Sequence, residues 1–542
     1  MIFLSTLLLA VLITIGMTPL LSSLAIRHNL VDLPGLRKVH CLPIPRIGGV
    51  AMACGAFVPL LFWYHGDRFV LAFLVGAATL IIFGLLDDLH DLSPKVKFAG
   101  QIVAALIVII GGDVQITSLG TLLPDMLHLP TIVGVPLTLV AIVGATNAIN
   151  LSDGLDGLAG GICLLIFAAI GYLAYLEGSP VIGLIALALF GVLFGFLRFN
   201  THPATIFMGD AGSQFLGFSA ATLAIALTQS KPTLSPGLPL ILLGFPILDT
   251  LTVMVTRIVQ NKSPFSADKN HFHHHLLGLG LQQSESVLVI YIFQTLLVVA
   301  SLLLRYYSDW MLLFCYLLFS AVVLIIFGRA RRNEWPLGRF RMFNNRIIGR
   351  LRLVKREGLM IKSTFPAFEI GIPLLLLATS VQAGPAPVPV RFGALVCSLV
   401  ISATWFWGHQ FINNVLRAVL YLMIPFTVYL SETRPVLQLD GMLQTGFTML
   451  FVIFAVMILF ISKFSRRQSG FKSSPMDFLI IILAVAIPNL PDQRLQEYQV
   501  GLVAAKVIML YFSFEVLMAE QHGKLHRIAV ATVISLVVLA VK

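Results

Sequence analysis

Three aspartates fall within five residues in the stretch "DDLHDLSPK", which begins at Asp87 directly after an apolar run. Two adjacent carboxylates such as Asp87 and Asp88 repel each other, and a hard divalent cation relieves that repulsion. Mg²⁺ prefers oxygen ligands and is usually held by one or two carboxylates together with substrate phosphates. Alternatively, one of the two acids acts as a base or a nucleophile, or the pair simply forms a solvated helix end.

A second polar stretch, "NAINLSDGLDGLAGG", interrupts two apolar segments at residues 147–161. It contains Asn147, Asn150, Asp153 and Asp156, and its glycines allow the backbone to approach a ligand closely. A helix cap needs only one such residue. We therefore interpret this stretch as a binding loop, with an Asx-rich cap as the alternative.

The third stretch, "FNTHPATIFMGDAGSQFLG", covers residues 199–217. Its "GDAGS" portion predicts the end of a loop and the start of a helix, where free backbone N–H groups favour anions. Asp210 is a candidate metal ligand. Phe207 is a candidate stacking partner for a nucleobase, although ordinary packing explains it equally well.

Four of the thirteen histidines lie within five residues of the fourth stretch, "SPFSADKNHFHHHLLGLG". A zinc site would need further ligands at defined spacing, and none is evident in the sequence. The pattern favours a short polar helix that presents His271, His273 and His274 to phosphate oxygens. Lys269 would add positive charge to that site.

Two further features carry polar groups. The basic, proline-rich stretch "KVHCLPIPRIGG" places Lys38, His40 and Arg46 where they could meet phosphate, or where they only follow the positive-inside rule. Asp249 lies within an apolar segment. An acid there is a functional candidate by default, or a structural hydrogen-bond acceptor.

These stretches are embedded in a strongly apolar chain. The 542 residues are 58% hydrophobic and 11% charged, where soluble domains average about 25% charged residues. Roughly eighteen segments have the length of about 20 apolar residues that a transmembrane helix needs. The composition predicts an all-α, polytopic integral membrane protein, with about eleven helices in a core and about seven more toward the C-terminus.

The net charge of +11 follows from basic residues in alternate loops, which is typical of the positive-inside rule and indicates no nucleic-acid partner. With the N-terminus outside, every motif-bearing loop falls on the cytoplasmic face. The predicted parts are a catalytic core at 1–328, a basic cytoplasmic linker at 329–366 and a region of unassigned role at 367–542. The five cysteines show no spacing that indicates disulfides or zinc.

In this order, the motif loops resemble those of the polyprenyl-phosphate N-acetylhexosamine-1-phosphate transferases, glycosyltransferase family 4. That family includes the translocase that builds lipid I and the enzymes that start O-antigen. The resemblance covers residues 1 to about 330. "DKNHFHH" is similar to the UDP-N-acetylglucosamine branch, whereas the muramyl-pentapeptide branch usually has "TPTMGG" in place of "IPRIGG".

The resemblance implies a reaction. A UDP-linked amino sugar, expected to be UDP-GlcNAc, donates its sugar-1-phosphate to undecaprenyl phosphate, and UMP leaves. It implies dependence on Mg²⁺, with Mn²⁺ as a substitute, and a place in the bacterial inner membrane at the first membrane step of a surface polysaccharide or O-antigen. The extra C-terminal helices could serve homodimer contacts, glycolipid handling or partner docking.

The resemblance also implies residue roles. Asp87, Asp88 and His273 are the expected catalytic groups, and Asp210 with Asp87 is the expected metal site. Whether a carboxylate attacks as a nucleophile or deprotonates the lipid phosphate stays open. The remaining positions are expected to contact nucleotide or substrate: Lys38, Arg46, Asn150, Asp153, Asp156, Asn200, Phe207, Lys269, His271 and His274.

Two other classes of function compete with this interpretation. A secondary transporter would also contain intramembrane acids such as Asp249 and broken helices. Against it, the acids crowd one face and the sequence shows no two-fold internal repeat. A non-catalytic membrane scaffold would not account for the acids in the loops. The same chemistry with a different UDP-amino sugar is a further alternative.

Overall fold

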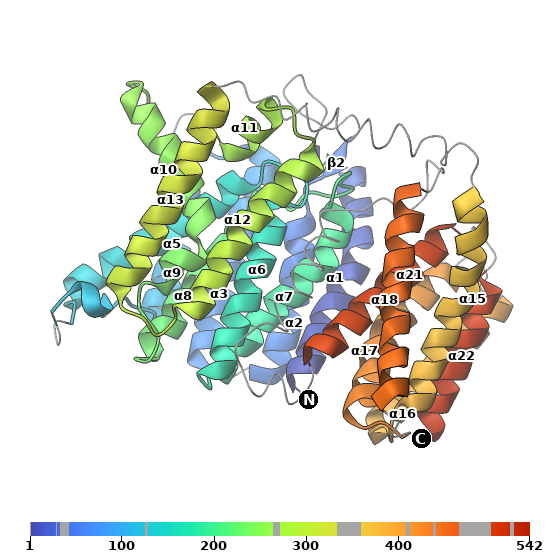
Figure 1. Ribbon diagram of the computed structural model, residues 1–542. Helices are drawn as coiled ribbons and strands as arrows, with labels where there is room; N and C mark the ends of the chain where they lie inside the picture. The colour runs from blue at the N-terminus through green and yellow to red at the C-terminus, as the bar shows by residue number, and fades with distance from the viewer. Residues whose placement is uncertain are drawn as a thin grey trace. The chain divides into compact units, whose positions relative to one another are not determined.

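The computed structural model describes residues 2–28, 30–32, 43–64, 66–124, 128–263, 271–332, 359–407, 412–436, 441–464, 500–520 and 525–542. Twelve helices in these ranges are long and apolar enough to cross a membrane, which confirms the prediction of an all-α polytopic protein. The described helices form two compact units, α1 to α13 and α15 to α22 (Figure 1).

The first unit contains the elements α1 (Ile2–Arg27), β1 (Val31–Asp32), β2 (Ile44–Pro45), α2 (Gly48–Tyr64), α3 (Arg68–His90), α4 (Pro94–Leu106), the π-helical η1 (Ile107–Gly111), the 3-10 helix η2 (Gly120–Leu122), α5 (Thr131–Ser152), α6 (Leu158–Leu176), α7 (Pro180–Asn200), α8 (Gly209–Ser230), α9 (Leu238–Leu242), α10 (Gly244–Val259), α11 (Phe272–Gly278), α12 (Gln283–Leu303) and α13 (Asp309–Arg332). The helices expected from hydropathy are present. One of them, expected as a continuous helix near 237–256, is divided into α9 and α10.

Near the break between α9 and α10, Pro246 lacks the N–H that would bond to Leu242 O. Side chains of neighbouring helices donate to carbonyls there: Gln294 Nε2 donates to Leu242 O at 2.8 Å, and the Tyr316 hydroxyl donates to Gly244 O at 3.0 Å. Hydrocarbon offers no water to satisfy such groups, so a broken helix in a membrane needs protein partners of this kind. Hydropathy alone does not reveal the break, because the sequence stays apolar across it.

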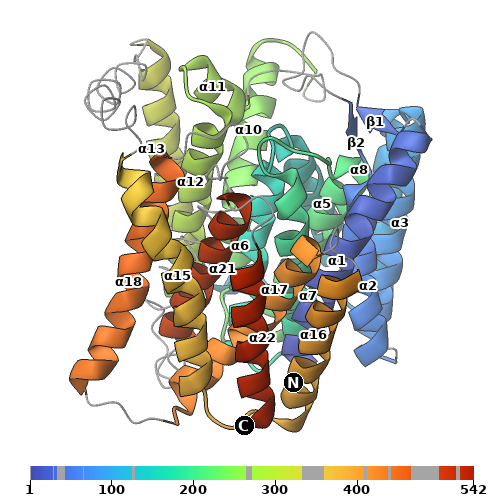
Figure 2. The same ribbon diagram turned by 90° about the vertical axis from the view of Figure 1, so that its right-hand side faces the viewer.

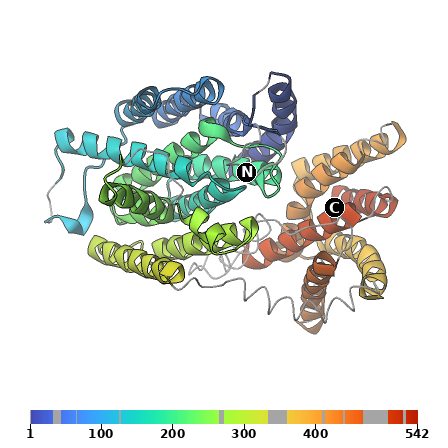
Figure 3. The same cartoon turned by 90° about the horizontal axis from the view of Figure 1, so that it is seen from above.

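Helix α8 lies at the centre of the first unit. Its membrane span is 94% buried, against 22% for α13 at the periphery. It packs against α2, α3, α5 and α6, and Figure 3 shows the green and teal helices between the blue and the yellow-green ones. Small residues allow this close approach: a methyl group added at Gly84 of α3 would lie 2.3 Å from Ala211 Cα at the start of α8.

The two short strands join the loop before α2 to the loop before α8. Val31 pairs with Pro45 in the antiparallel ladder. Phe207 N donates to Pro45 O at 2.8 Å, and Gly48 N donates to Phe207 O at 3.0 Å. Figure 2 shows β1, β2 and α11 at the same end of the first unit. These contacts bring motif loops that are distant in sequence to one end of the helical bundle.

A buried acid, Asp309 at the start of α13, connects loops that lie far apart in the sequence. Its carboxylate accepts the backbone N–H groups of Thr121 and Gly237, each at 2.8 Å, and also the Ser235 hydroxyl. Asp309 is 3% exposed. With four oxygen lone-pair sites, a carboxylate can accept all of these bonds, so this acid is structural.

The second unit contains α15 (Leu359–Gln382), α16 (Val388–Trp407), α17 (Ile412–Thr433), α18 (Gly441–Phe464), α21 (Val500–Glu520) and α22 (His526–Val541), drawn in orange to red in Figure 2. The segment predicted at 477–489 and most of the predicted linker at 329–366 lie outside the described residues. The core of this unit is apolar and includes Phe368, Leu416 and Leu510.

One ion pair lies inside that apolar core. Lys506 Nζ of α21 is 2.7 Å from Glu432 Oε1 of α17, and the two side chains are 3% and 6% exposed. The ammonium group also lies 5.2 Å from the ring centre of Phe447 and 4.9 Å from that of Phe451. A buried ion pair is weak evidence for stability, but removing one partner is strongly destabilising.

Candidate active site

A lysine connects two of the predicted acids. Lys97 Nζ lies 3.2 Å from Asp210 Oδ2 and forms a still closer ion pair with Asp87 Oδ2. Asp87, in the last turn of α3, is 3% exposed and also accepts the Leu92 backbone N–H at 2.8 Å. Two acids from helices more than 100 residues apart in sequence therefore share one cation.

The local sequence explains how Lys97 reaches this position. Helix α3 ends at Asp91, which adopts the left-handed conformation (φ 47°), and Ser93 precedes Pro94 at the start of α4. Proline is favoured in the first turn of a helix because its missing N–H is not needed there. The chain reverses over these few residues, so the first turn of α4 lies beside the last turn of α3.

Asp88 has different partners from its neighbour Asp87. Its Oδ1 accepts the backbone N–H of Asp210 at 3.2 Å, and its Oδ2 accepts that of Ala211 at 3.4 Å. A carboxylate at a helix N-terminus is stabilised by the helix dipole and by free N–H groups. The "GDAGS" turn does attract an anion, as predicted, but in this structure the anion is the protein's own carboxylate.

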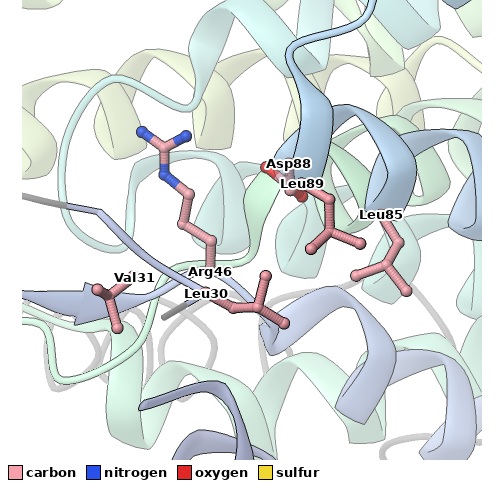
Figure 4. Close-up of a pocket in the computed structure, with 6 residues that line it drawn as sticks. All are labelled: Leu30, Val31, Arg46, Leu85, Asp88 and Leu89. Carbon is pink, nitrogen blue, oxygen red and sulfur yellow. The ribbon is translucent and has the colours of Figure 1, made fainter. Parts of the chain in front are cut away.

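Asp88 also lines an open pocket. Its lining residues are labelled in Figure 4: Leu30, Val31, Arg46, Leu85, Asp88 and Leu89. The Arg46 side chain is 36% exposed and pairs with Asp32. Arg46, a predicted phosphate contact, therefore lies at the rim of the acidic site and is held there by an acid that sequence reasoning missed.

The loop after α5 brings a further acid toward the site. Asp153 is half-buried, directly after the last turn of α5, and its N–H donates to Asn150 O at 3.1 Å. Burial raises the pKa of Asp153 to about 7, with the negative charges of Asp210 and Asp156 as further causes. The Asp153 carboxyl therefore gains and loses its proton near neutral pH.

Two residues expected to contact nucleotide, Asn200 and Asp156, also hold the loops together. Asn200 is 2% exposed; its Oδ1 accepts the Gly157 N–H at 3.1 Å and its Nδ2 donates to Ile206 O at 2.9 Å. Asp156 Oδ2 lies 2.8 Å from His202 Nδ1. Because both ends of the Asn200 amide are bound to backbone, this residue organises the binding loops rather than presenting a free amide.

The histidine stretch forms the short helix α11, as predicted. Asp249 of α10 accepts the Phe272 backbone N–H at 2.9 Å and lies 3.0 Å from His271 Nδ1. Asp249 is therefore a structural hydrogen-bond acceptor, one of its two predicted roles, and it fixes the start of α11. His271 is 5% exposed, so its contact with Asp249 determines the orientation of its ring.

His273, in the first turn of α11, lies against the loop after α5. A methyl group added at Gly154 would lie 2.3 Å from His273 Nε2, which shows how closely the two elements approach. Burial lowers the pKa of His273 to about 3, and the neighbouring His274 adds to the effect. His273 is therefore neutral at physiological pH and offers a directed hydrogen bond rather than a positive charge.

The other predicted residues are placed as follows. Phe207 and His274 are half-buried near the same end of the first unit, and Phe207 is bound through both its N–H and its C=O. Lys38 and Lys269 lie outside the described residues. Asp87, Asp88 and Asp210 lie together, and the histidines of α11 contact Asp249 and the loop after α5.

Sequence reasoning missed Lys97, Gln101 and Gln214. The spacing of polar residues in the sequence does indicate them. Lys97 and Gln101 are four residues apart in α4, and Asp210 and Gln214 are four apart in α8, which places each pair on one helix face. Polar residues at this spacing in otherwise apolar helices indicate a buried polar contact.

The donor set is compatible with Mg²⁺. Asp87 and Asp210 aim carboxylate oxygens at one cationic group, Lys97. Across the described residues, no three His, Cys, Asp or Glu side chains lie close enough to form a cage made by protein alone. Mg²⁺ rarely uses such a cage, because it keeps water molecules and binds one or two carboxylates plus substrate phosphates.

An acidic site at one end of a polytopic helical bundle is consistent with the comparisons to known sequences. Residues 70–228 match the profile of glycosyl transferase family 4, and the chain belongs to this family. It is therefore a membrane-embedded phosphosugar transferase by class.

Particular relatives narrow the class. The chain is 38% identical over 330 residues to the "Probable undecaprenyl-phosphate N-acetylglucosaminyl 1-phosphate transferase" of Bacillus subtilis (strain 168), covering 60% of this chain and 91% of the relative. It is 30% identical over 321 residues to the "Undecaprenyl-phosphate alpha-N-acetylglucosaminyl 1-phosphate transferase" of Escherichia coli (strain K12), covering 58% and 86%. The Yersinia pestis protein of the latter name is 28% identical over 324 residues, covering 58% and 88%.

Proposed function

We propose that this chain transfers GlcNAc-1-phosphate from a UDP-sugar to undecaprenyl phosphate. An oxygen of the acceptor phosphate forms a bond to the phosphorus that carries the sugar, and the bond from that phosphorus to the oxygen of UMP breaks. The relatives' names supply the acceptor and the sugar. The observation that carries the proposal is the convergence of Asp87, Lys97 and Asp210.

The chemistry requires two anionic phosphates to meet, so neutralisation of charge must contribute most to catalysis. Asp87 and Asp210 would hold Mg²⁺, or Mn²⁺ in its place, and the bound ion would supply the positive charge that neutralises phosphate oxygens. Lys97 adds a fixed positive charge at the same point. His273, neutral in the free protein, can orient a phosphate or sugar oxygen by a single hydrogen bond.

The location of the site suits both substrates. The lipid phosphate lies at the height of the headgroups and the nucleotide arrives from the aqueous phase, so loops at one end of the bundle can reach both. Positive charge in the loops supports a cytoplasmic site in a bacterial inner membrane. The product would begin a cell-surface polysaccharide such as O-antigen.

Release of UMP tests the proposal directly. Purified full-length protein would be supplied with UDP-GlcNAc, undecaprenyl phosphate and Mg²⁺, with EDTA and Asp210→Asn as controls. We expect UMP release that requires both substrates and is lost in both controls. Absence of release with UDP-GlcNAc and with other UDP-sugars would reject the proposed reaction.

The donor sugar needs a separate comparison. UDP-GalNAc and UDP-GlcNAc would be compared by their kcat/KM values with the same acceptor. Preference for UDP-GalNAc would correct the sugar and leave the reaction class intact.

Sedimentation of the protein in detergent tests the further prediction of a homodimer.

A further inference from the structure

Two buried amides, Gln101 and Gln214, and the half-buried amide of Asn147 form a cluster one helical turn from the Lys97–Asp210 contact. Gln101 Nε2 donates to Gln214 Oε1 at 3.1 Å, and Asn147 Nδ2 donates to Gln101 Oε1 at 2.7 Å. Gln101 Nε2 also approaches Asn147 Oδ1 at 3.3 Å. Gln101 and Gln214 are 3% and 2% exposed. Gln101 and Gln214 were not singled out from the sequence, whereas Asn147 belongs to the stretch interpreted above as a binding loop.

The cluster joins the helices that carry the ionisable groups. Gln101 follows Lys97 by one turn in α4, and Gln214 follows Asp210 by one turn in α8. The Lys97–Asp210 and Gln101–Gln214 contacts are therefore successive links between the same two helices. Asn147 adds α5, the helix whose last turn is followed by Asp153.

Directional bonds determine the axial position of a helix in a way that apolar packing does not. Lipid tails are as apolar as the side chains, so membrane helices have little hydrophobic driving force between them, and hydrogen bonds contribute to the position of α4 against α8. A hydrogen bond between buried amides loses its strength with a small change in distance or angle. In a low-dielectric interior the hydrogen bond is stronger than in water, so the free energy lost with it is larger.

We propose that Gln101, together with Asn147 and Gln214, forms a positioning cluster that sets the separation of Lys97 from Asp210. The inference rests on the proposed function, because it assigns the cluster a role at that cation- and phosphate-binding site. The three amides touch no reacting group. They act by fixing the position of α4 along the axis of α8. That position in turn determines how Lys97 faces the carboxylates of Asp87 and Asp210.

Gln294 provides a matched control. It is also a buried glutamine in a membrane helix, 0% exposed, and its Nε2 donates to Leu242 O at 2.8 Å. It differs in lying at the α9–α10 break and in bonding to backbone. A change that only removes a buried amide should affect Gln294→Leu and Gln101→Leu alike.

The experiment compares full-length Gln101→Leu, Gln214→Met and Gln294→Leu with the unaltered protein. Three quantities are measured: Mn²⁺ affinity by electron paramagnetic resonance without substrates, kcat and KM for UMP release, and the midpoint of thermal unfolding. For Gln101→Leu and Gln214→Met we expect about tenfold weaker Mn²⁺ binding. We also expect about tenfold lower kcat, since displacements near 1 Å can cost up to about 100-fold. Gln294→Leu should lower the unfolding midpoint without either effect.

Two further variants protect the test against misfolding. The exchange of Gln101→Asn with Asn147→Gln keeps two amides facing each other and should recover at least half of the lost Mn²⁺ affinity. The double variant Gln101→Leu/Gln214→Met should be no worse than either single variant, because the residues act as one unit. Additive losses, or no recovery in the exchanged pair, would contradict the proposal.

The outcome also separates this inference from the proposed function. Unchanged Mn²⁺ affinity and kcat in folded Gln101→Leu would show that the cluster only packs helices. Absence of UMP release from the unaltered protein would reject the transferase proposal instead, while the comparison of Mn²⁺ affinities would still support or overturn the positioning role.

Discussion

Asp88 caps the helix that carries Asp210: the backbone N–H of Asp210 donates to Asp88 Oδ1 at 3.2 Å. The neighbouring Asp87 instead shares Lys97 with the Asp210 side chain. Asp88 thus binds the backbone of Asp210, and Asp87 is linked to the Asp210 side chain through Lys97. Three carboxylates therefore lie close together, and each has a cation or a backbone N–H group as a favourable partner.

Replacing Asp210 by Asn tests the proposed cation site. The substitution keeps the volume of the side chain but removes the charge that faces Lys97, so turnover should fall by about 100- to 1000-fold, as when a preorganised electrostatic group is lost. UMP release and the thermal unfolding midpoint would be measured together. Asp113→Asn is a suitable control, because Asp113 (φ 56°) follows the far end of the α4–η1 segment and Asn tolerates its conformation. Near-normal activity in Asp210→Asn would remove Asp210 from the site.

Asp88→Asn separates the capping role of Asp88 from a chemical role. Asn keeps one acceptor oxygen for the two N–H groups that Asp88 binds, so the fold should persist and the unfolding midpoint should fall only modestly. Loss of a base or nucleophile should still reduce kcat by about 100- to 10,000-fold. A variant with normal kcat would show that Asp88 serves the structure alone.

The pKa of Asp153, raised to about 7, predicts two effects of pH. Protonation stabilises the folded chain here, because the folded-state pKa lies above the ordinary value for aspartate. The stabilisation is therefore present at low pH and is lost as pH rises through about 7. Asp153→Asn should unfold at a higher temperature than the unaltered protein at pH 8, and the difference should shrink as the pH is lowered.

The same substitution should change the pH profile of kcat/KM, which reports groups of the free enzyme. We expect a limb near pH 7 that is weakened in Asp153→Asn and to which Asp210 also contributes. No limb from His273 should appear between pH 5 and 8, because its pKa is lowered to about 3. A limb that persists in Asp153→Asn but vanishes in His273→Gln would reverse this assignment.

The buried ion pair of the second unit predicts a stability effect without a direct catalytic one. Glu432→Leu leaves Lys506 charged and unpaired among apolar side chains, which should cost about 3–5 kcal/mol. Thermal unfolding of the full chain would measure the loss. The double variant Glu432→Leu/Lys506→Met should recover most of it, and equal losses in the single and double variants would show that the pairing does not matter.

A shortened chain tests whether the second unit belongs to the catalytic machinery. The Bacillus subtilis relative is covered to 91% of its length by 60% of this chain, so a transferase of that family does not need all 542 residues. A chain that ends at residue 365 should keep measurable UMP release in detergent. A folded but inactive truncation would show that the helices after residue 365 are required for the reaction.

Much of the fold was predictable because a bilayer leaves few choices. Apolar runs of sufficient length must be helical, so the positions of α3, α5 and α12 follow from hydropathy to within a few residues. The division of α9 from α10 does not follow from hydropathy, because the sequence stays apolar around Pro246 and the side chains that bond to the carbonyls there, Gln294 and Tyr316, come from other helices. The pairing of Asp309 with Thr121 and Gly237 is equally invisible in the linear sequence.

For the site, residue types, spacing and the family resemblance indicated which side chains are candidates. Acids and histidines in polar stretches of a chain with so few charges pointed to Asp87, Asp88, Asp153, Asp210 and His273. Tertiary structure decided what each of them touches. Whether an acid meets a lysine, a helix N-terminus or another acid depends on helices brought within a few ångströms by small residues such as Gly84, and neither those contacts nor the resulting pKa of Asp153 can be calculated before the helices are placed together.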